Sequence, residues 1–194
     1  RTLQYHSVDA LFQRLRADID AAIAQFSRGS LFLHAGVFVL EDMAILLPGK
    51  SGSGKTTLVY EALSRGAVYY SDEYALVEAD GTVLPFARPL SVKIDGHREK
   101  KPFTPASLGA EIGLAPLRID VVAVTHFVEG AQWQPEILSP SEVVFEMVAN
   151  TIAAESRPED TLSRTALLIP PCPAVKGVRG EASDWLDWIV SKYK

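Results

Sequence analysis

A glycine-rich stretch followed by lysine and threonine, at residues 49–57, carries the clearest chemistry in this sequence. Gly49 to Thr56 match the pattern G-x-x-x-x-G-K-[ST] without a mismatch. Glycines let such a backbone curl so that several N–H groups point at one anion. Lys55 would reach the β- and γ-phosphates of a nucleotide, and the Thr56 hydroxyl would ligate the Mg²⁺ that bridges them. The predicted nucleotide-binding residues are Gly49, Lys50, Ser51, Gly52, Ser53, Gly54, Lys55, Thr56 and Thr57.

The flanks of this stretch support the same interpretation. Residues 43–47 form a short apolar run that suits a buried strand, and residues 58–63 favour a helix. The positive N-terminal end of that helix would face the phosphates. A flexible Gly/Ser linker would explain the glycines, but it would not explain the Lys55-Thr56 pair or the apolar flanks. The sequence therefore predicts a phosphate-binding loop between a strand and a helix.

An adjacent pair of carboxylates, Asp72 and Glu73, supplies candidates for the second half of such a site. Phosphoryl transfer needs carboxylates to hold Mg²⁺ and to manage the proton of the attacking group. Asp72 lies 17 residues after Lys55, which leaves room for one helix, a turn and a returning strand. The pair follows that strand, at the end where open α/β sheets bind ligands. Thr56, Asp72 and Glu73 are the candidates to approach the metal, and one carboxylate of the pair would approach the acceptor hydroxyl instead. Because a strand alternates its faces, only one of the two is expected to reach the site cleanly.

The elements that must position these residues follow from periodicity and turn signals. Apolar residues spaced by three or four predict an amphipathic helix over 8–26. Asp80-Gly81 between two apolar runs predicts a hairpin, and Ser139 to Glu142 form a capping box. Strands are predicted over 30–39, 43–47, 67–70, 74–78, 82–86, 90–94, 119–128 and 174–177, and helices over 8–26, 58–63, 105–108, 140–154, 159–168 and 181–193. This pattern predicts a single α/β domain over residues 1–194 with a mixed sheet.

Composition limits the classes of protein to consider. The 194 residues are 47% hydrophobic, which is typical of a globular domain with a sizeable core. The net charge of −5 argues against nucleic acid as the main partner, and the basic run at 98–101 is interpreted as a solvated loop. No apolar stretch reaches the roughly 18–20 residues that span a membrane, so no membrane partner is expected.

Cysteine usage and the N-terminal residues bear on the compartment. Cys172 is the only cysteine, so no intrachain disulfide can form and a reducing, cytoplasmic compartment fits. We interpret this thiol as structural or incidental. The first residues lack a signal-peptide pattern, and the absence of an initiator methionine leaves room for residues before Arg1.

Residues 32–94 resemble the catalytic domain of HPr kinase/phosphorylase and its relatives, including shorter HPr-kinase-like proteins. That family has a His-Gly-type strand before its phosphate loop, and His34 precedes Gly49 by the family's 15 residues. Asp72 and Glu73 stand where the family has an Asp-Asp pair. The resemblance implies that Asp72 handles the proton of a serine acceptor and that His34 lies near the phosphates. It also implies ATP and Mg²⁺ as cofactors, a small protein or peptide acceptor, and a cytoplasmic homo-oligomer.

The sequence also departs from the family in two places. Glu73 replaces the second aspartate, and the segment at 90–93 lacks the glutamate of the family's Leu-Glu-Ile-Arg-like stretch. These differences put the second metal-side carboxylate and the reverse reaction, phosphorolysis, in question. ATP-dependent phosphoenolpyruvate carboxykinase shares a similar loop, but this chain is far too short for that enzyme.

Several basic residues are further candidates near the phosphates. Lys93 could supply a cation, or its segment could be an ordinary strand. Lys176 and Arg179 are interleaved with glycines, which suits a loop that approaches phosphate but is also common at surfaces. His126 is interpreted as a core or edge histidine because apolar strand residues surround it.

These observations lead to one main hypothesis and two alternatives. The main one is an ATP-dependent phosphotransferase that acts on a hydroxyl, with serine of a small protein or peptide as the expected acceptor. The first alternative is a nucleotide-binding regulatory module with little or no transfer activity. The second is a small-molecule kinase on the same scaffold.

Overall fold

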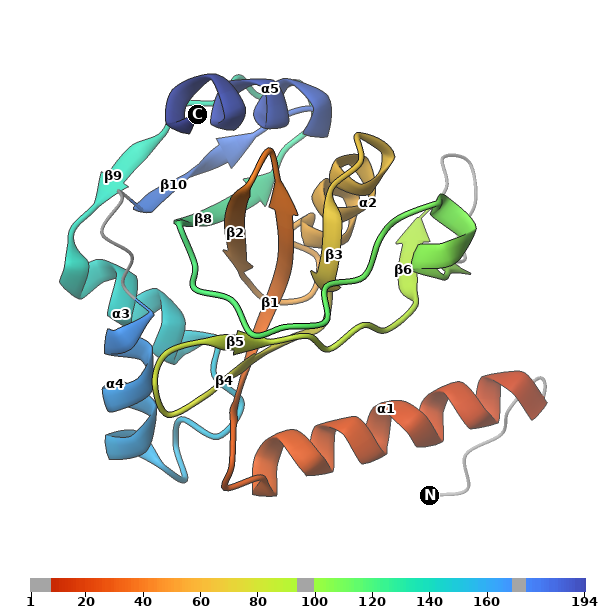
Figure 1. Cartoon of the computed structure of the whole chain (residues 1–194), viewed down its shortest axis with the longest axis vertical. Coiled ribbons are helices and arrows are strands. Elements are labelled where there is room, and N and C mark those ends of the chain that lie inside the picture. The colour runs from red at the N-terminus through yellow and green to blue at the C-terminus, as the bar shows by residue number, and fades with distance from the viewer. Residues whose placement is uncertain (1–7, 94–99, 169–173) are drawn as a thin grey trace.

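The chain folds into a mixed α/β structure built around an open sheet (Figure 1). The computed structural model describes residues 8–93, 100–168 and 174–194. The elements, in chain order, are α1 (Val8–Phe26), β1 (Leu31–Leu40), β2 (Met43–Pro48), α2 (Lys55–Ser64), β3 (Val68–Ser71), β4 (Tyr74–Val77), β5 (Val83–Leu84), β6 (Leu90–Lys93), β7 (Lys100–Phe103), the 3-10 helix η1 (Pro105–Leu108), β8 (Val121–Phe127), β9 (Glu136–Leu138), α3 (Pro140–Ala149), α4 (Pro158–Leu167), β10 (Ala174–Arg179) and α5 (Ala182–Tyr193).

The main sheet has the order β5-β4-β1-β2-β8-β10-β9, with β3 also paired to β1. Strand β1 is long and changes partner on one side: residues 37–39 pair with β3, and residues 31–34 pair with β4. Its other side forms a tight hairpin with β2, closed by Glu41 and Asp42 at positive φ. A smaller sheet contains β6 and β7.

Strand direction brings several strand ends to one edge of the sheet. Strands β2, β8 and β10 are parallel to one another. Because β1 is antiparallel to both β2 and β3, β3 runs in the same direction as β2. The segments that follow β2, β3, β8 and β10 therefore start at the edge where open α/β sheets bind ligands.

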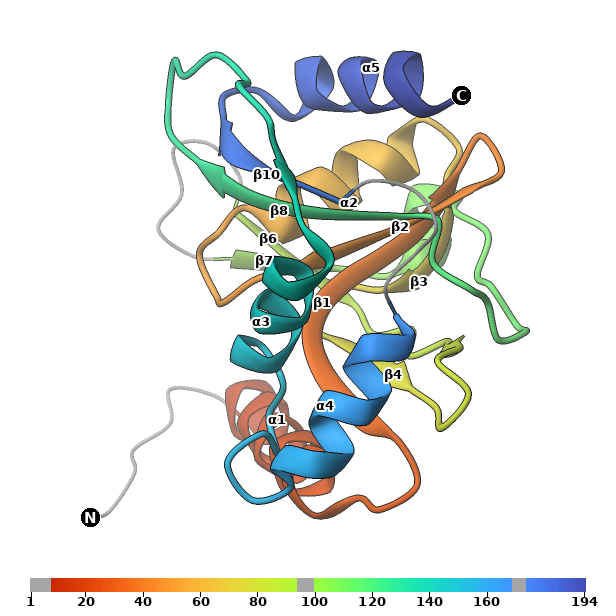
Figure 2. The same cartoon turned by 90° about the vertical axis from the view of Figure 1, so that its left-hand side faces the viewer.

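Two hydrophobic clusters hold helices against the two faces of the sheet (Figure 2). On one face, α2 and α5 pack on residues such as Ile45 and Val121. On the other, Val143 and Met147 of α3 pack on residues such as Leu46. Strand β2 contributes to both clusters and is buried along its whole length. This sandwich of helix, sheet and helix fixes the position of the loop that follows β2.

The structure confirms most of the predicted elements and adds two strands. Strands β7 and β9 were not predicted; they have only four and three residues, and proline interrupts the pattern of β7. The second arm of the Asp80-Gly81 hairpin is also shorter than predicted, since β5 has two residues.

The prediction that a helix extends from 140 to about 154 was wrong. The capping box at Ser139 is present, but α3 ends at Ala149. The Asn150 side chain donates to the carbonyl of Glu146 at 2.8 Å, and the Asn150 carbonyl accepts from the N–H of His34 at 2.8 Å. The competing bond to β1 turns the chain out of the helix.

Some predictions fall outside the described residues. These are the interpretation of Cys172, the proline connector at 170–173, and Arg98 and Glu99 of the basic run.

None of the helices in the described part of the chain has the length and apolar character needed to cross a membrane.

Candidate functional site

The loop between β2 and α2, residues 49–54, is called the glycine loop. Gly52 and Gly54 both have φ of 92°, a conformation that other residues adopt only at a cost. Gly54 is the N-cap of α2, and a Cβ added there would lie 2.6 Å from Nη2 of Arg179. The first N–H groups of α2 have no partner within the helix, so this end can accept a negatively charged ligand.

Lys55 begins α2 and turns its side chain back over the glycine loop. The side chain is buried, and its Nζ donates to the carbonyls of Gly49 at 2.5 Å and Lys50 at 3.0 Å. The ammonium is therefore held within the curve of the loop.

Thr56 and Asp72 meet although they are 16 residues apart. The Thr56 hydroxyl donates to Oδ2 of Asp72 at 2.9 Å, and the aspartate is buried. Asp72 directly follows β3, and Thr56 is in the first turn of α2. The structure thus brings together the glycine loop and the carboxylate that the sequence predicted to act with it.

Glu73 and His34 lie beside this pair with different degrees of exposure. The side chain of Glu73 is 57% exposed, whereas that of His34 is 20% exposed, and 3.8 Å separates Nε2 of His34 from the Glu73 carboxylate. Burial, and then the charge of Lys55, lower the pKa of His34 from 6.5 to about 4. The imidazole is therefore neutral at pH 7 despite the nearby glutamate.

Arg179, at the end of β10, is buried against the glycine loop. Its Nη2 donates to the carbonyl of Gly54 at 2.8 Å and its Nη1 to that of Gly180 at 2.7 Å, while Nε has no partner within the described residues. No carboxylate in the described part of the chain lies within ion-pair distance. Burial lowers the pKa of Arg179 to about 10, so the guanidinium stays charged at pH 7.

A hollow of about 790 Å³ joins these residues. Lys55, Thr56, Asp72, Glu73, His34 and Arg179 all line it. Thr57 also lines it, as do Ser51, Gly52 and Gly54 of the glycine loop. The site residues predicted from the sequence therefore converge on this hollow or on the loop that borders it.

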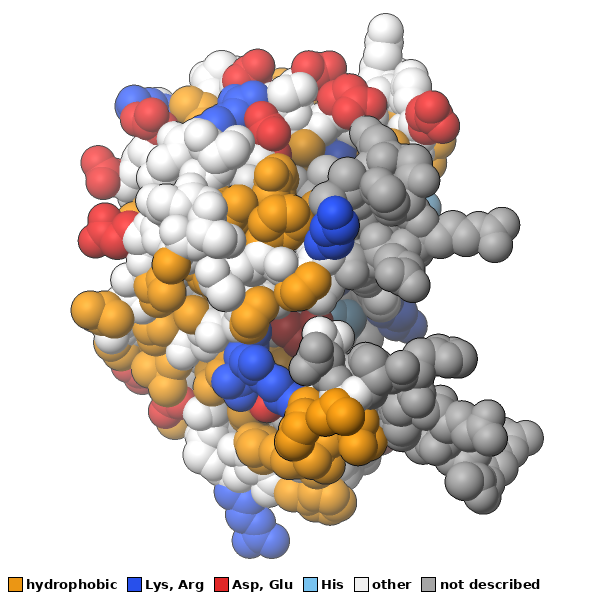
Figure 3. Space-filling model, turned by 90° about the vertical axis from the view of Figure 1, so that its right-hand side faces the viewer, with side chains coloured by type: hydrophobic (Ala, Val, Ile, Leu, Met, Phe, Trp, Pro, Cys, Tyr) orange, Lys and Arg blue, Asp and Glu red, His pale blue; other side chains and the backbone are white. Residues whose placement is uncertain are grey.

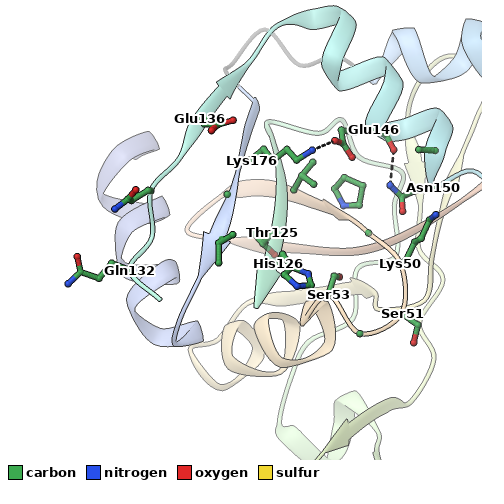
Figure 4. Close-up of a pocket in the computed structure, with 18 residues that line it drawn as sticks. Lys50, Ser51, Ser53, Thr125, His126, Gln132, Glu136, Glu146, Asn150 and Lys176 are labelled. Carbon is green, nitrogen blue, oxygen red and sulfur yellow. Dashed lines mark hydrogen bonds and ion pairs between the residues drawn. The ribbon is translucent and has the colours of Figure 1, made fainter. Parts of the chain in front are cut away.

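A second hollow of about 810 Å³ lies against the same loop (Figure 4). It shares Ser51 and Gly52 with the first hollow and is also lined by Gly49, Lys50 and Ser53. Across it, Nζ of Lys176 and the carboxylate of Glu146 form an ion pair at 2.6 Å. The glycine loop thus has open space on two sides.

The additional basic candidates separate into different environments. Arg179 reaches the glycine loop, whereas Lys176 faces the second hollow in its ion pair with Glu146. His126 lines the second hollow and is exposed, so it is an edge residue rather than a core one. The side chain of Lys93 lies outside what the structure describes, so its predicted role remains a prediction.

Sequence reasoning missed Arg88 and Phe127, which also line the first hollow. Arg88 pairs with Asp20 of α1 at 2.8 Å, and the Phe127 ring lies 5.4 Å from the guanidinium carbon of Arg179. Neither residue belongs to a motif with recognisable spacing. Phe127 stands at the end of the apolar run of β8, which was the one available signal.

The oxygen atoms beside Thr56 fit a hard divalent cation that also binds phosphate. Mg²⁺ is usually held by one or two carboxylates, substrate phosphates and water. Asp72 and Glu73 could supply the carboxylates, and Thr56 a hydroxyl oxygen. In residues 8–93, 100–168 and 174–194 no group of three or more His, Cys, Asp or Glu side chains forms a metal cluster.

The lowered pKa of His34 predicts a pH-dependent loss of stability. Between pH 6.5 and about 4 the unfolded chain binds a proton that the folded chain does not, so the unfolding free energy falls as pH decreases through this window. From pH 7 to pH 4.5 this contribution amounts to roughly 2 kcal/mol. We measure the unfolding free energy by urea denaturation at pH 7 and at pH 4.5. Between these pH values, the unfolding free energy of wild type should fall by roughly 2 kcal/mol more than that of His34→Gln.

His126→Gln is the matched control for this measurement, because it replaces a histidine that is exposed. Its stability should change with pH as the wild type's does. Equal losses for wild type and His34→Gln would show that the imidazole is not held neutral by the fold.

Comparison with known proteins finds similarity among solved structures and not among family models or curated proteins. No model of a protein family matches the sequence, and no curated protein matches it. Among solved structures, the chain is similar to the HPr(Ser) kinase/phosphatase from Coxiella burnetii, with 13% sequence identity and a TM-score of 0.36. The matched region covers 84% of this chain and 87% of that chain. An identity of 13% and a TM-score of 0.36 are too low to assign a function.

Proposed function

We propose that this protein binds ATP with Mg²⁺ at the glycine loop and transfers the γ-phosphate to a hydroxyl group, with serine of a small protein or peptide as the acceptor. The observation that carries the proposal is the 2.9 Å hydrogen bond between Thr56 and the buried Asp72. It joins a loop suited to phosphate with a carboxylate suited to metal and proton chemistry. The whole chain, 1–194, would act as one cytoplasmic domain around a core at 32–94.

Phosphate binding would use groups that already converge on the first hollow. The N–H groups at the start of α2, which lack partners within the helix, would donate to phosphate oxygens, as helix N-termini commonly do. The Lys55 ammonium, which now donates to two loop carbonyls, would exchange them for phosphate oxygens with little movement. The buried Arg179 guanidinium, which has only the more distant charge of Glu181 near it, would gain a directly bonded anion.

The metal would be held beside Thr56. The Thr56 hydroxyl and the Asp72 carboxylate already share a hydrogen bond, and Glu73 lies next in sequence and lines the same hollow. When bound, Mg²⁺ would neutralise charge on the transferring phosphate.

In the transfer step, Asp72 would accept the proton of the acceptor hydroxyl. A bond forms between that hydroxyl oxygen and the γ-phosphorus, while the bond from the γ-phosphorus to the β–γ bridging oxygen breaks and leaves ADP. His34, neutral at pH 7, could donate a hydrogen bond to the phosphate without adding a charge. Lys55 and Arg179 would stabilise the negative charge of the transition state.

Nucleotide binding is the first test of this proposal. We expect a fluorescent ATP analogue to bind with Mg²⁺ and to lose at least about tenfold in affinity when EDTA removes the metal. Lys55→Met should weaken binding further, since it removes the charge inside the loop. Lys192→Met is the matched control, because it removes an exposed lysine of α5 that lines neither hollow. Absence of binding in wild type would refute the proposal.

Transfer is tested separately with γ-labelled ATP and a library of serine-containing peptides and small hydroxyl compounds. Label on a peptide supports the proposed acceptor, and label on a small compound alone would favour the small-molecule kinase. Binding without label on any acceptor would favour the regulatory module.

A further inference from the structure

Helix α1 turns its large apolar side chains away from the rest of the molecule. Seven of them are between 45% and 79% exposed: Val8, Leu11, Phe12, Leu15, Ile19, Ile23 and Phe26. We call these seven side chains the α1 face. Figure 3 views the molecule from the side toward which α1 extends, and hydrophobic side chains gather on the surface low on that side.

The contacts that tie α1 to the body come from the other side of the helix and from its C-terminal half. Ala24 is buried with Phe32 and Tyr74, and Asp20 pairs with Arg88 at 2.8 Å. Gln25 donates to the hydroxyl of Ser156 at 3.1 Å. The helix is therefore anchored by small and polar groups while its apolar face is open to water.

An open face of this size is unusual for an isolated protein. A fully buried large side chain removes on the order of 150–200 Å² from water. At the exposures given above, the seven residues therefore present roughly 700 Å². A stable dimer needs about 800 Å² from each partner. Two copies that pair through α1 would thus supply nearly the area of a standard interface.

The spacing of the α1 face fits a pair of helices. Steps of four and three residues alternate along a seam formed by Val8, Phe12, Leu15, Ile19, Ala22 and Phe26. This is the heptad pattern by which two helices interdigitate. Leu11 and Ile23 widen the seam on its two edges.

The sizes of the seam residues favour an antiparallel pair. About a two-fold axis at Ala17, Phe12 meets Ala22 of the other copy, Val8 meets Phe26, and Leu15 meets Ile19. Each layer then combines residues of compatible volume. A parallel pair would instead oppose Phe12 to Phe12 and Ala22 to Ala22, giving one crowded layer and one empty layer.

We propose that α1 is a self-association helix, which pairs antiparallel with α1 of a second copy of this chain about a two-fold axis near Ala17. Such an isologous contact closes on itself and produces a dimer. The proposal does not depend on the nucleotide site. The Asp20–Arg88 ion pair nevertheless connects α1 to a residue that lines the first hollow.

Sedimentation equilibrium of the full chain over a range of concentrations tests the proposal. We expect wild type to dimerise, and the double substitution Leu15→Glu/Ile19→Glu to raise the dimer dissociation constant by more than about 100-fold, because it buries carboxylates without partners. Circular dichroism should show that the variant stays folded. The matched control is Gln13→Glu/Ala17→Glu, which adds the same charges at the same spacing outside the seam.

Cysteine cross-linking tests the orientation in a Cys172→Ser background. Arg16→Cys lies near its own counterpart in the antiparallel pair and should react with a short bis-maleimide. Ile23→Cys, on the same edge of the seam, would lie roughly 20 Å along the axis from its counterpart and should not react. A wild-type monomer at every concentration, a dimer that survives Leu15→Glu/Ile19→Glu, or cross-linking at both positions would overturn the proposal.

Discussion

Replacing Asp72 with asparagine is expected to abolish phosphoryl transfer while leaving nucleotide binding nearly intact. The amide has the same shape and its oxygen can still accept the hydrogen bond from Thr56, now 2.9 Å long. It cannot take up the proton of an acceptor hydroxyl, and general-base catalysis of this kind contributes about 10²–10⁴-fold. We therefore expect the rate of label transfer to fall about 10³-fold, with less than a tenfold change in affinity for the ATP analogue.

Glu73→Gln is the matched control for this prediction. It makes the same change of charge one residue away, on a side chain that is 57% exposed. Its effect on transfer should be at least about tenfold smaller, because an exposed carboxylate is readily replaced by water around the metal. If Glu73→Gln abolished transfer and Asp72→Asn did not, the assignment of the proton acceptor would have to be reversed.

Replacing Arg179 with methionine is expected to weaken ATP binding strongly and to change stability little. The side chain is 1% exposed, and its two hydrogen bonds go to carbonyl groups rather than to a carboxylate. Losing those bonds costs stability. Removing a buried charge that has no directly bonded carboxylate, and only the more distant Glu181, offsets much of that cost. The lost interaction with phosphate should reduce affinity about 100-fold, measured by titration with the ATP analogue.

Arg164→Met is the control for Arg179→Met. It shows whether the loss of ATP affinity is specific to Arg179 or follows from removing any partly buried arginine. Arg164 is half-buried, whereas Arg179 is fully buried, and the Nε of Arg164 pairs with Asp160 of α4 at 2.7 Å. Its replacement should lower the unfolding free energy and leave ATP affinity unchanged. If both variants lost stability equally and kept their affinity, Arg179 would be a purely structural residue.

The elements around the site were predictable because local signals define them. Gly49 to Thr56 match a continuous motif. The strand before the motif and the helix after it are marked by apolar residues that lie close together in the sequence. The capping box at Ser139 also marks a helix start that the structure confirms. Each of these predictions depends on residues within one or two turns of each other.

What the sequence could not predict depends on contacts between distant segments. Helix α3 ends early because Asn150 bonds to His34, which lies more than a hundred residues away. Arg179 was recognised only as a cation among glycines, and nothing local indicated that it reaches the carbonyl of Gly54. The open α1 face was equally hidden, since an amphipathic pattern does not say whether the apolar side turns inward or outward.

The backbone hydrogen bonds of His34 allow its side chain to be replaced without changing the main-chain contacts of the site. Its N–H donates to the carbonyl of Asn150 and its carbonyl accepts from the N–H of Gly49, so the main chain alone ties the end of α3 to the start of the glycine loop. Every side chain other than proline preserves these two links. Saturation mutagenesis of this codon would therefore report the contribution of the imidazole, with the architecture of the loop as a constant background.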